Sequence, residues 1–392
     1  MLFILLACTK ATPDTSGLQD TQDTQDTQDS AMLPLECQTV ESGWGPDGST
    51  ALTVEVVVQG LATPWAMDWL PDGRMLLTER DGRLSLVEDG ELTVLAQVPV
   101  TESGEGGLLG LALHPEFAQN RAFFLYATVD RDGTENQVQQ WVLAEDALSA
   151  SFDTMILEGI PARRYHNGGR LRIGPDDKLY VGTGDAGDPD SSQDTSSLAG
   201  KVLRLELDGS IPADNPFSGS ATWVYGVRNT QGFDWQDDGR MLISDHGPSG
   251  LGNEGGRSGH DEISLASAGD NLGWPQVYAC EEGEGFVQAS ITFSQAMPPG
   301  GAAIYRGSEL QDWQGDLIIG VLGFETAARH LHRLRIGPGG NVLISEVYLS
   351  EEYGRLREVT MGPDGGLYVS TSNCDGRGDC GDGDLVLRVG AP

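Results

Sequence analysis

A recurring turn-and-strand unit constrains the fold of this chain more than any other feature. In each copy, a turn of Pro, Asp or Gly residues precedes a short strand rich in Leu and in β-branched or aromatic residues, and a polar turn follows. Four copies are clear and two are degenerate; they lie at 71–79, 174–182, 237–244 and 362–370, and at 315–320 and 123–126. The copies recur at about 50 to 75 residues, a period at which units of short strands indicate a β-propeller.

Six copies predict an all-β fold, a six-bladed β-propeller of four-stranded antiparallel blades. One blade cannot bury both of its faces alone, so the blades must stack in a ring. An array of β-sandwiches is the structural alternative. The 54 glycines suit such turns, because tight turns need residues that adopt positive φ angles. In a propeller the loops at one end of the central channel converge, so functional residues are expected in the irregular segments between the copies.

The charge of the chain excludes one class of partner. The sequence holds 24 Lys and Arg against 59 Asp and Glu, a formal net charge of −35, which repels nucleic acid. Only Lys10, Lys178 and Lys201 are lysines, so nearly all cations are arginines. No stretch of about 20 apolar residues is present, and no transmembrane helix is expected.

The N-terminal segment differs from the rest of the chain. Residues 1–7 are apolar and end in Leu-Leu-Ala before Cys8, which looks like a bacterial lipobox; a chance apolar start is the alternative. Residues 19–29 repeat Thr-Gln-Asp, a low-complexity acidic sequence that cannot bury a core. We therefore expect a truncated lipoprotein signal at 1–7, an acidic tether at 8–48 and the propeller at 49–392. The chain would be exported, to the cell envelope or beyond, with a lipid on Cys8 as its only membrane attachment.

The cysteines support export. Setting Cys8 aside leaves Cys37, Cys280, Cys374 and Cys380, an even number that suggests two disulfides in an exported chain. Cys374 and Cys380 are close in sequence and form the favoured pair, which leaves Cys37 with Cys280. Free buried thiols are the alternative. Zinc lacks support, because no Cys-x-x-Cys pair or nearby histidine accompanies them.

Three polar clusters between the repeats are candidates for a site. His166 lies in a small-residue loop before a strand, where a neutral imidazole could accept a proton. Arg228 and Asn229 supply adjacent donors suited to carboxylate or carbonyl oxygens. Arg355 and Arg357, at i and i+2 of a strand, project to the same face and would need an anion between them, unless that face is solvated.

Two oxygen-rich loops are candidates for a cation. The first runs from Asp245 to Glu262 and is rich in glycine, a composition that suits a hard cation such as Ca²⁺. The second, 374–384, does not match the EF-hand template and is either a weak Ca²⁺ site or a disulfide-closed surface turn, the interpretation we favour.

At these residues the chain resembles the soluble PQQ-dependent glucose and aldose sugar dehydrogenases, a family of six-bladed propellers related to the propeller domain of hedgehog-interacting proteins. Nine motifs occur in the family's order over nearly all of residues 55–390. They are Gly60–Met67, Gly104–Gly110 with Leu113–Pro115, His166–Leu171, Gly200–Arg204, Pro212–Phe217, Arg228–Gly232, Gly259–Ile263, Gly273–Pro275 and Arg355–Glu358.

The resemblance implies a role for each candidate. His166 matches the general base that takes the proton of the sugar C1 hydroxyl while hydride moves to the quinone. Arg228, which is also assigned to the catalytic set, and Asn229 match residues at the quinone oxygens. Arg355 and Arg357 match arginines that hold the carboxylates of PQQ. The implied activity is oxidation of aldoses to lactones, with an external electron acceptor.

The resemblance also implies a calcium site and marks two departures. The backbone carbonyls of Gly247 and Pro248 match ligands of the Ca²⁺ that polarises the quinone. Glu105, a further position of the cofactor and sugar pocket, stands where well-known members have glutamine. A lysine that contacts the cofactor is absent, since Lys201 is the last lysine in the chain, and Arg329 lies in the corresponding region.

Two other functions fit the same scaffold. The first is a non-catalytic, surface-displayed binding propeller that has lost PQQ activity. The second is a lactonase-type hydrolase, which would need a channel Ca²⁺ held by Glu, Asn and Asp side chains.

Overall fold

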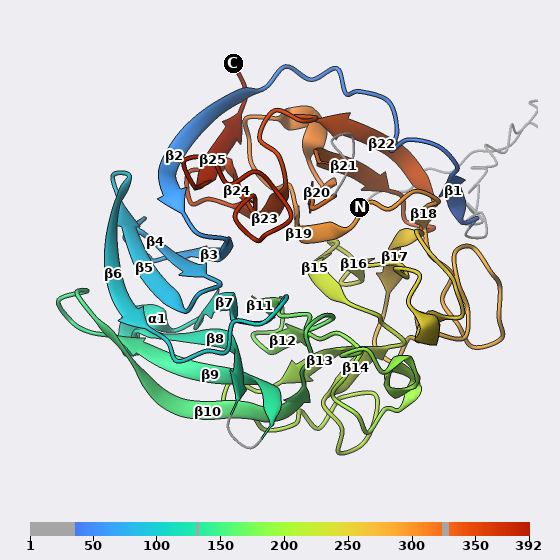
Figure 1. The fold of residues 1–392 in the computed structure, drawn as a ribbon, viewed down its shortest axis with the longest axis horizontal. Coiled ribbons are helices and arrows are strands. Elements are labelled where there is room, and N and C mark those ends of the chain that lie inside the picture. Colours follow the sequence, from blue (N-terminus) through green and yellow to red (C-terminus); the bar gives the residue numbers. More distant parts are fainter. Residues whose placement is uncertain (1–35, 131–132, 324–328) are drawn as a thin grey trace, which may run out of the picture. The chain divides into compact units, whose positions relative to one another are not determined.

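The computed structural model describes residues 36–130, 133–323 and 329–392. The predicted signal, the lipid-bearing Cys8 and most of the predicted tether therefore lie outside the described residues. Within these residues, six sheets are arranged in a ring (Figure 1). No helix in the described part of the chain is both long enough and apolar enough to cross a membrane.

The first three blades follow one another along the chain. Each consists of four antiparallel strands in sequential order. Blade 1 contains β3 (Pro64–Trp69), β4 (Met75–Glu79), β5 (Arg83–Glu88) and β6 (Glu91–Gln97). Blade 2 contains β7 (Leu108–Leu113), β8 (Ala122–Asp130), β9 (Thr134–Leu143) and β10 (Ala150–Pro161), with the short helix α1 (Phe117–Asn120) between its first two strands. Blade 3 contains β11 (Leu171–Ile173), β12 (Leu179–Gly182), β13 (Lys201–Leu205) and β14 (Thr222–Tyr225).

The last three blades include strands from the N-terminal part of the chain. Blade 4 contains β15 (Thr230–Trp235), β16 (Met241–Asp245), β17 (Asp261–Ala266) and β18 (Ile291–Phe293), and β1 (Gln38–Val40) adds a parallel fifth strand beside β18. Blade 5 contains β19 (Pro299–Ile304), β20 (Leu317–Val321), β21 (Leu331–Ile336) and β22 (Val342–Tyr348). Blade 6 contains β23 (Leu356–Met361), β24 (Leu367–Thr371), β25 (Asp384–Gly390) and the N-terminal strand β2 (Thr53–Leu61).

The ring is closed in two ways. Around the ring β3 contacts β7, β7 contacts β11, β12 of blade 3 contacts β15, β15 contacts β19, β19 contacts β23, and β23 returns to β3. Because β2 pairs with β25, the two ends of the propeller share one sheet and no blade can leave the ring without breaking that pairing. These contacts confirm the six-bladed all-β prediction. The strand β1 pairs with blade 4 although it precedes residue 49, so the propeller includes residues N-terminal to the predicted boundary.

The six repeats occupy equivalent places. Each ends in, or lies within, the second strand of a blade, and in four blades an Asp oxygen caps the turn before that strand. Asp72 Oδ1, for example, accepts a hydrogen bond from the Arg74 amide, and Gly73 between them has a φ of 89°. The strand that follows is buried along its whole length, as in β4, because a neighbouring blade covers each face. The turn residues thus set the start of a strand that then forms core.

Both predicted disulfides are present. Cys37 is bonded to Cys280, next to β1 and blade 4, and Cys374 is bonded to Cys380 in the loop between β24 and β25. The first joins the N-terminal part of the propeller to a point 243 residues further along the chain. The cysteines of the second are only six positions apart in the sequence, so this bond closes a short loop.

Candidate functional site

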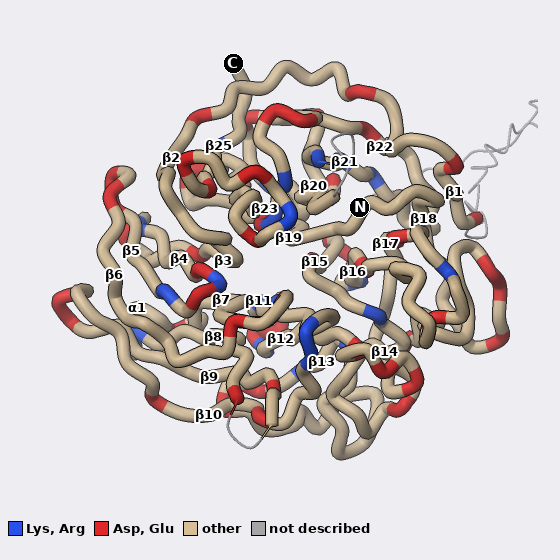
Figure 2. Tube along the Cα trace, in the orientation of Figure 1, with Lys and Arg blue, Asp and Glu red and all other residues tan. Residues whose placement is uncertain are grey.

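A cavity of about 410 Å³ lies at one end of the channel. The loops that precede the innermost strands and those that follow the second strands form its walls. Of the predicted site residues, the structure places seven on these walls: Glu105, His166, Arg228, Gly247, Pro248, Arg355 and Arg357. Basic and acidic residues are interspersed around the channel, whereas acidic residues also lie along the peripheral loops (Figure 2).

His166 is paired with a buried carboxylate. Its Nδ1 lies 2.7 Å from Asp185 Oδ1, and Asp185 also accepts hydrogen bonds from the Gly187 amide and from Trp274 Nε1. Both partners of the pair are buried. Because a carboxylate only accepts hydrogen bonds, Nδ1 carries the ring proton and Nε2 is the nitrogen that can accept one. This is the arrangement of a general base held in one tautomer.

The backbone at His166 is in an unusual conformation for a residue with a side chain. Its φ is 59°, in the left-handed region, which disfavours residues other than glycine. The carboxylate of Glu105 accepts a hydrogen bond from the His166 amide at 2.9 Å and so holds this conformation. Burial opposes ionisation of Glu105, but the positive charge of Arg377 and the hydrogen bond from the His166 amide help to keep its pKa below the ordinary value.

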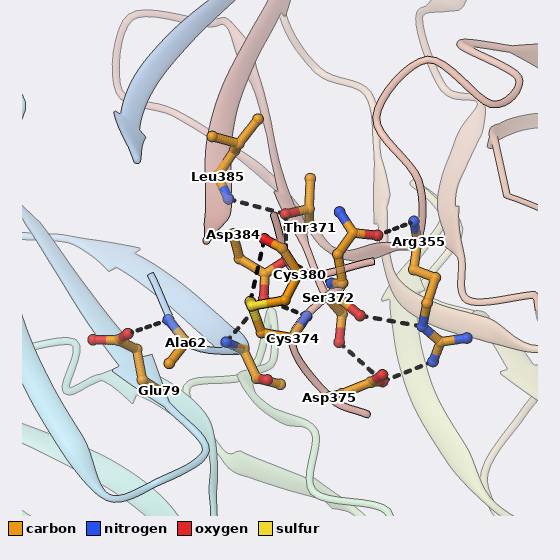
Figure 3. The surroundings of a disulfide bond; sticks show 12 residues. Ala62, Glu79, Arg355, Thr371, Ser372, Cys374, Asp375, Cys380, Asp384 and Leu385 are labelled. Carbon is orange, nitrogen blue, oxygen red and sulfur yellow. Dashed lines mark hydrogen bonds and ion pairs between the residues drawn. A yellow bond between two sulfur atoms is a disulfide. The ribbon is translucent and has the colours of Figure 1, made fainter. Parts of the chain in front are cut away.

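Arg355 and Arg357 share one carboxylate, as Figure 3 shows for the first of them. Asp375 Oδ2 lies 2.7 Å from Arg355 Nη2 and 3.4 Å from Arg357 Nη2. Burial alone would raise the pKa of Asp375, but the two guanidinium groups hold it below the ordinary value. Burial also lowers the pKa of Arg357 to about 10, so the pair stays charged at neutral pH. Two cations with one anion leave a net positive charge of one unit.

The two arginines differ in how far the protein uses their donors. Arg355 donates from Nε to the Ser372 carbonyl and from Nη1 to the carbonyls of Leu322 and Gly323, besides its ion pair. Arg357 donates from Nε to Ser372 Oγ and from Nη1 to Gln231 Oε1. Arg357 therefore uses fewer of its five donors within the protein, and it is the better placed of the two to bind an anion in the cavity.

Arg228 is neutralised within the protein. Its guanidinium forms an ion pair with Glu254 at 2.6 Å, with side-chain exposures of 2% and 1%. Glu254 also accepts hydrogen bonds from the amides of Ser249 and Leu251, so it fixes the loop that covers this side of the cavity. The backbone amides of Arg228 and Asn229 both donate to Asp245.

Asn229 lies behind the wall of the cavity. Its Oδ1 accepts a hydrogen bond from the Gly168 amide, two residues after His166. Its Nδ2 is buried and makes no hydrogen bond to any residue that the structure describes. A buried amide donor without an acceptor costs free energy, so this nitrogen would gain from any oxygen that reaches it.

The predicted calcium ligands are held by a buried aspartate. Asp261 accepts hydrogen bonds from the amides of Gly247 and Met297, and burial raises its pKa to about 6. The Pro248 carbonyl accepts a hydrogen bond from the Gly259 amide, and both Gly247 and Pro248 line the cavity. Across residues 36–130, 133–323 and 329–392, no cluster of three His, Cys, Asp or Glu side chains is placed to hold a metal. A cation here would depend on carbonyl oxygens.

Four residues of the site escaped the sequence reasoning. They are the acidic partners Asp185, Glu254 and Asp375, and the basic residue Arg377, which contacts Glu105 across the mouth of the cavity. Asp375 and Arg377 lie in the loop that we interpreted as a surface turn. The loop is a disulfide-closed turn, but its composition could not show that two of its side chains reach the site. Arg329 does not line the cavity, and residues 324–328 beside it lie outside the described residues.

The sequence matches one family over most of its length. The sequence model described as "Glucose / Sorbosone dehydrogenase" covers residues 61–386. The chain belongs to this family. The match confirms the family predicted from the nine motifs and, with it, the prediction that the protein is an enzyme, an oxidoreductase.

Solved structures and curated proteins agree with this membership. An oxidoreductase (glucose dehydrogenase) of Thermus thermophilus is 42% identical, with a TM-score of 0.78 over 86% of this chain and 100% of that chain. The PQQ-bound aldose sugar dehydrogenase of Streptomyces coelicolor is 33% identical, with a TM-score of 0.76 over 88% and 99%. The aldose sugar dehydrogenase of Escherichia coli is 31% identical over 88% of this chain and 96% of its own length.

Proposed function

We propose that this member of the glucose/sorbosone dehydrogenase family is a PQQ- and Ca²⁺-dependent enzyme. It oxidises the C1 hydroxyl of aldose sugars to lactones and passes the electrons to an external acceptor. The observation that carries the proposal is that His166, held by Asp185, and a partly neutralised arginine pair face one cavity. Relatives that are named as sugar dehydrogenases, one of them PQQ-bound, support it.

The residues of the cavity fit an anionic quinone. PQQ carries three carboxylates, and Arg357 with Arg355 retains one net positive charge after Asp375 is counted. The Nδ2 of Asn229 offers a buried donor that the described protein does not satisfy. The carbonyls of Gly247 and Pro248 would hold Ca²⁺, a cation that accepts such ligands. When bound, PQQ supplies the two-electron acceptor and Ca²⁺ the Lewis acid.

The protein's own part in the reaction is proton removal and charge stabilisation. His166 Nε2 takes the proton from the sugar hydroxyl, and the imidazolium that results is stabilised by Asp185. Glu105 holds the backbone of His166 in place, which fixes the direction of the imidazole. Arg228, held in place by Glu254, offers oriented N–H donors to oxygen atoms in the cavity.

Titration of the purified propeller with PQQ and Ca²⁺, followed by dye reduction with a panel of aldoses, tests the proposal. Micromolar or tighter PQQ binding and turnover of at least one aldose are expected. His166→Ala should lower turnover by about 10²- to 10⁴-fold and leave PQQ affinity nearly unchanged. Arg357→Ala should instead weaken PQQ binding, whereas Arg240→Ala, a change at a half-buried arginine that does not line the cavity, should change neither. Failure of the wild-type protein to bind PQQ would favour the non-catalytic binding propeller.

We also propose that the chain is exported and anchored by a lipid on Cys8. Two disulfides support an oxidising location, since such bonds are rare in the reducing cytosol. Cells that express the full chain should incorporate radiolabelled fatty acid into the protein, and Cys8→Ala should abolish the label. Equal labelling of both proteins would refute the anchor.

A further inference from the structure

The Cys374–Cys380 loop contacts two separate parts of the site. From one side of the loop, Asp375 reaches Arg355 and Arg357, the proposed anion-binding pair. From the other side, Arg377 Nη1 and Nη2 lie 3.4 and 3.3 Å from Glu105 Oε1. Glu105 is on the loop before blade 2, so this contact crosses the cavity mouth from blade 6. None of the nine sequence motifs includes this loop.

The residues in each of these two contacts also bind a further residue of the site. Asp375 Oδ2 lies 3.2 Å from Ser372 Oγ, which in turn accepts a hydrogen bond from Arg357 Nε, so the carboxylate and the serine fix one guanidinium together. Glu105 uses Oε1 for Arg377 and Oε2 for the His166 amide. One short loop thereby contacts the partners of both the arginine pair and the proposed general base.

The covalent closure of the loop gives these contacts their geometry. Asp375 follows Cys374 directly, and the disulfide links Cys374 to Cys380, six residues further on. On the other side of the same cysteine, the amides of Asn373 and Cys374 donate to Asp384, at the start of β25 (Figure 3). A glycine-rich loop without such a link would have many conformations, and ordering it on ligand binding would cost affinity.

We infer that Asp375 and Arg377 are positioning residues of this enzyme, and that the Cys374–Cys380 disulfide holds them so that one loop sets both the arginine pair and His166. The inference rests on the proposed function and deepens it. Asp375 separates two like charges that would otherwise repel, and Arg377 keeps the carboxylate of Glu105 directed at the His166 backbone. Neither residue needs to touch the sugar.

The first test compares the two disulfides. Cys374→Ser/Cys380→Ser should weaken PQQ affinity about tenfold or more, measured by fluorescence titration, whereas the remote Cys37→Ser/Cys280→Ser should change it by less than about twofold. Asp375→Asn should weaken binding in the same way, because its amide keeps the shape of the side chain but loses the ion pairs that hold the two guanidinium groups in place. Tighter binding by Asp375→Asn would show that Asp375 competes with the ligand, and would overturn the inference.

The second test needs no cofactor. In protein labelled with ¹⁵N-histidine, the backbone amide signal of His166, assigned with His166→Ala, reports its bond to Glu105. Arg377→Gln, Glu105→Gln and the double variant should shift this signal and speed its exchange by similar amounts, because all three break one chain of contacts. Arg377→Lys should restore part of the shift, since it retains the charge.

The outcomes separate the two proposals. If wild-type protein fails to bind PQQ but the His166 signal responds to Arg377→Gln, the proposed function fails and the positioning of His166 stands. If PQQ binds, and neither the disulfide variant nor Arg377→Gln differs from wild type in affinity or in the His166 signal, the loop positions nothing and the inference is wrong.

Discussion

Replacing Asp185 by asparagine tests whether the carboxylate behind His166 acts as proposed. Asp185 accepts three hydrogen bonds, from His166 Nδ1 and the Gly187 amide at Oδ1, and from Trp274 Nε1 at Oδ2. Asparagine has the same shape but replaces one acceptor oxygen with an NH₂ group. In either orientation, that group faces at least one donor at less than 3 Å.

The structure favours one orientation and so gives a magnitude. With the amide nitrogen towards Trp274, one donor–donor contact results and His166 keeps its tautomer. With the nitrogen towards His166, the Gly187 amide is opposed as well and the ring proton must move to Nε2. In the first orientation the hydrogen bond from His166 Nδ1 is kept but loses its charged acceptor, which stabilises the imidazolium, a loss of about 1.5–3 kcal/mol, or roughly a 10- to 150-fold fall in kcat/KM. The second would cost about 10⁴-fold, as tautomer reversal does in a serine-protease triad.

Steady-state dye reduction with PQQ and Ca²⁺ at saturation measures this effect. PQQ affinity should stay within about threefold of wild type, because Asp185 lies behind His166 and is not among the described residues that line the cavity. Trp274→Phe, which removes only the third donor, serves as the matched control and should lower kcat/KM by less than about tenfold. A fall of less than threefold for Asp185→Asn would refute the assignment of His166 and Asp185 as a general-base pair.

Three further predictions concern stability. Burial lowers the pKa of Lys201 to about 7. Between about pH 7 and 10 the unfolded chain therefore binds one more proton than the folded protein, and the free energy of unfolding should rise with pH. In urea titrations, Lys201→Met should flatten this slope. The buried side chains of Arg170 and Glu358 form an ion pair at 2.5 Å. Glu358→Gln should lower the free energy of unfolding by about 3–5 kcal/mol in the same urea titrations. A decrease below about 1 kcal/mol would mean that the pair is not desolvated. Cys37→Ser/Cys280→Ser should lower unfolding stability by about 2–5 kcal/mol through the long loop that it opens, with unchanged stability as the contrary result.

Much of the fold could be predicted because its signals are local. Each repeat carries a turn and the buried strand that follows it, and Asp72 with Gly73 shows how two adjacent residues set one such turn. Counting the repeats then gave the number of blades. The β1 strand could not be predicted in this way, because three exposed or half-buried residues at 38–40 carry no repeat and pair with a strand about 250 positions away.

For the site, too, residues with a local sequence signal could be predicted and residues without one could not. His166, Arg228, Arg355 and Arg357 could be named because each lies in a motif whose residue types suit one kind of chemistry. Their partners could not, since an aspartate in a glycine-rich loop looks the same whether it faces water or a buried guanidinium. Asp375 illustrates this, because its sequence neighbourhood is that of a surface turn.

The sequence by itself thus determined the ring, the family, and the histidine and arginines that line the cavity. Only the tertiary structure decided the charge that those groups present. Strand pairing within blade 6 brings Asp375 to Arg355, and closure of the ring brings Arg377 to Glu105; these pairs are separated by 20 and 272 residues along the chain. A charge acts on what lies within a few ångströms of it, and that neighbourhood is set by blade packing rather than by sequence distance.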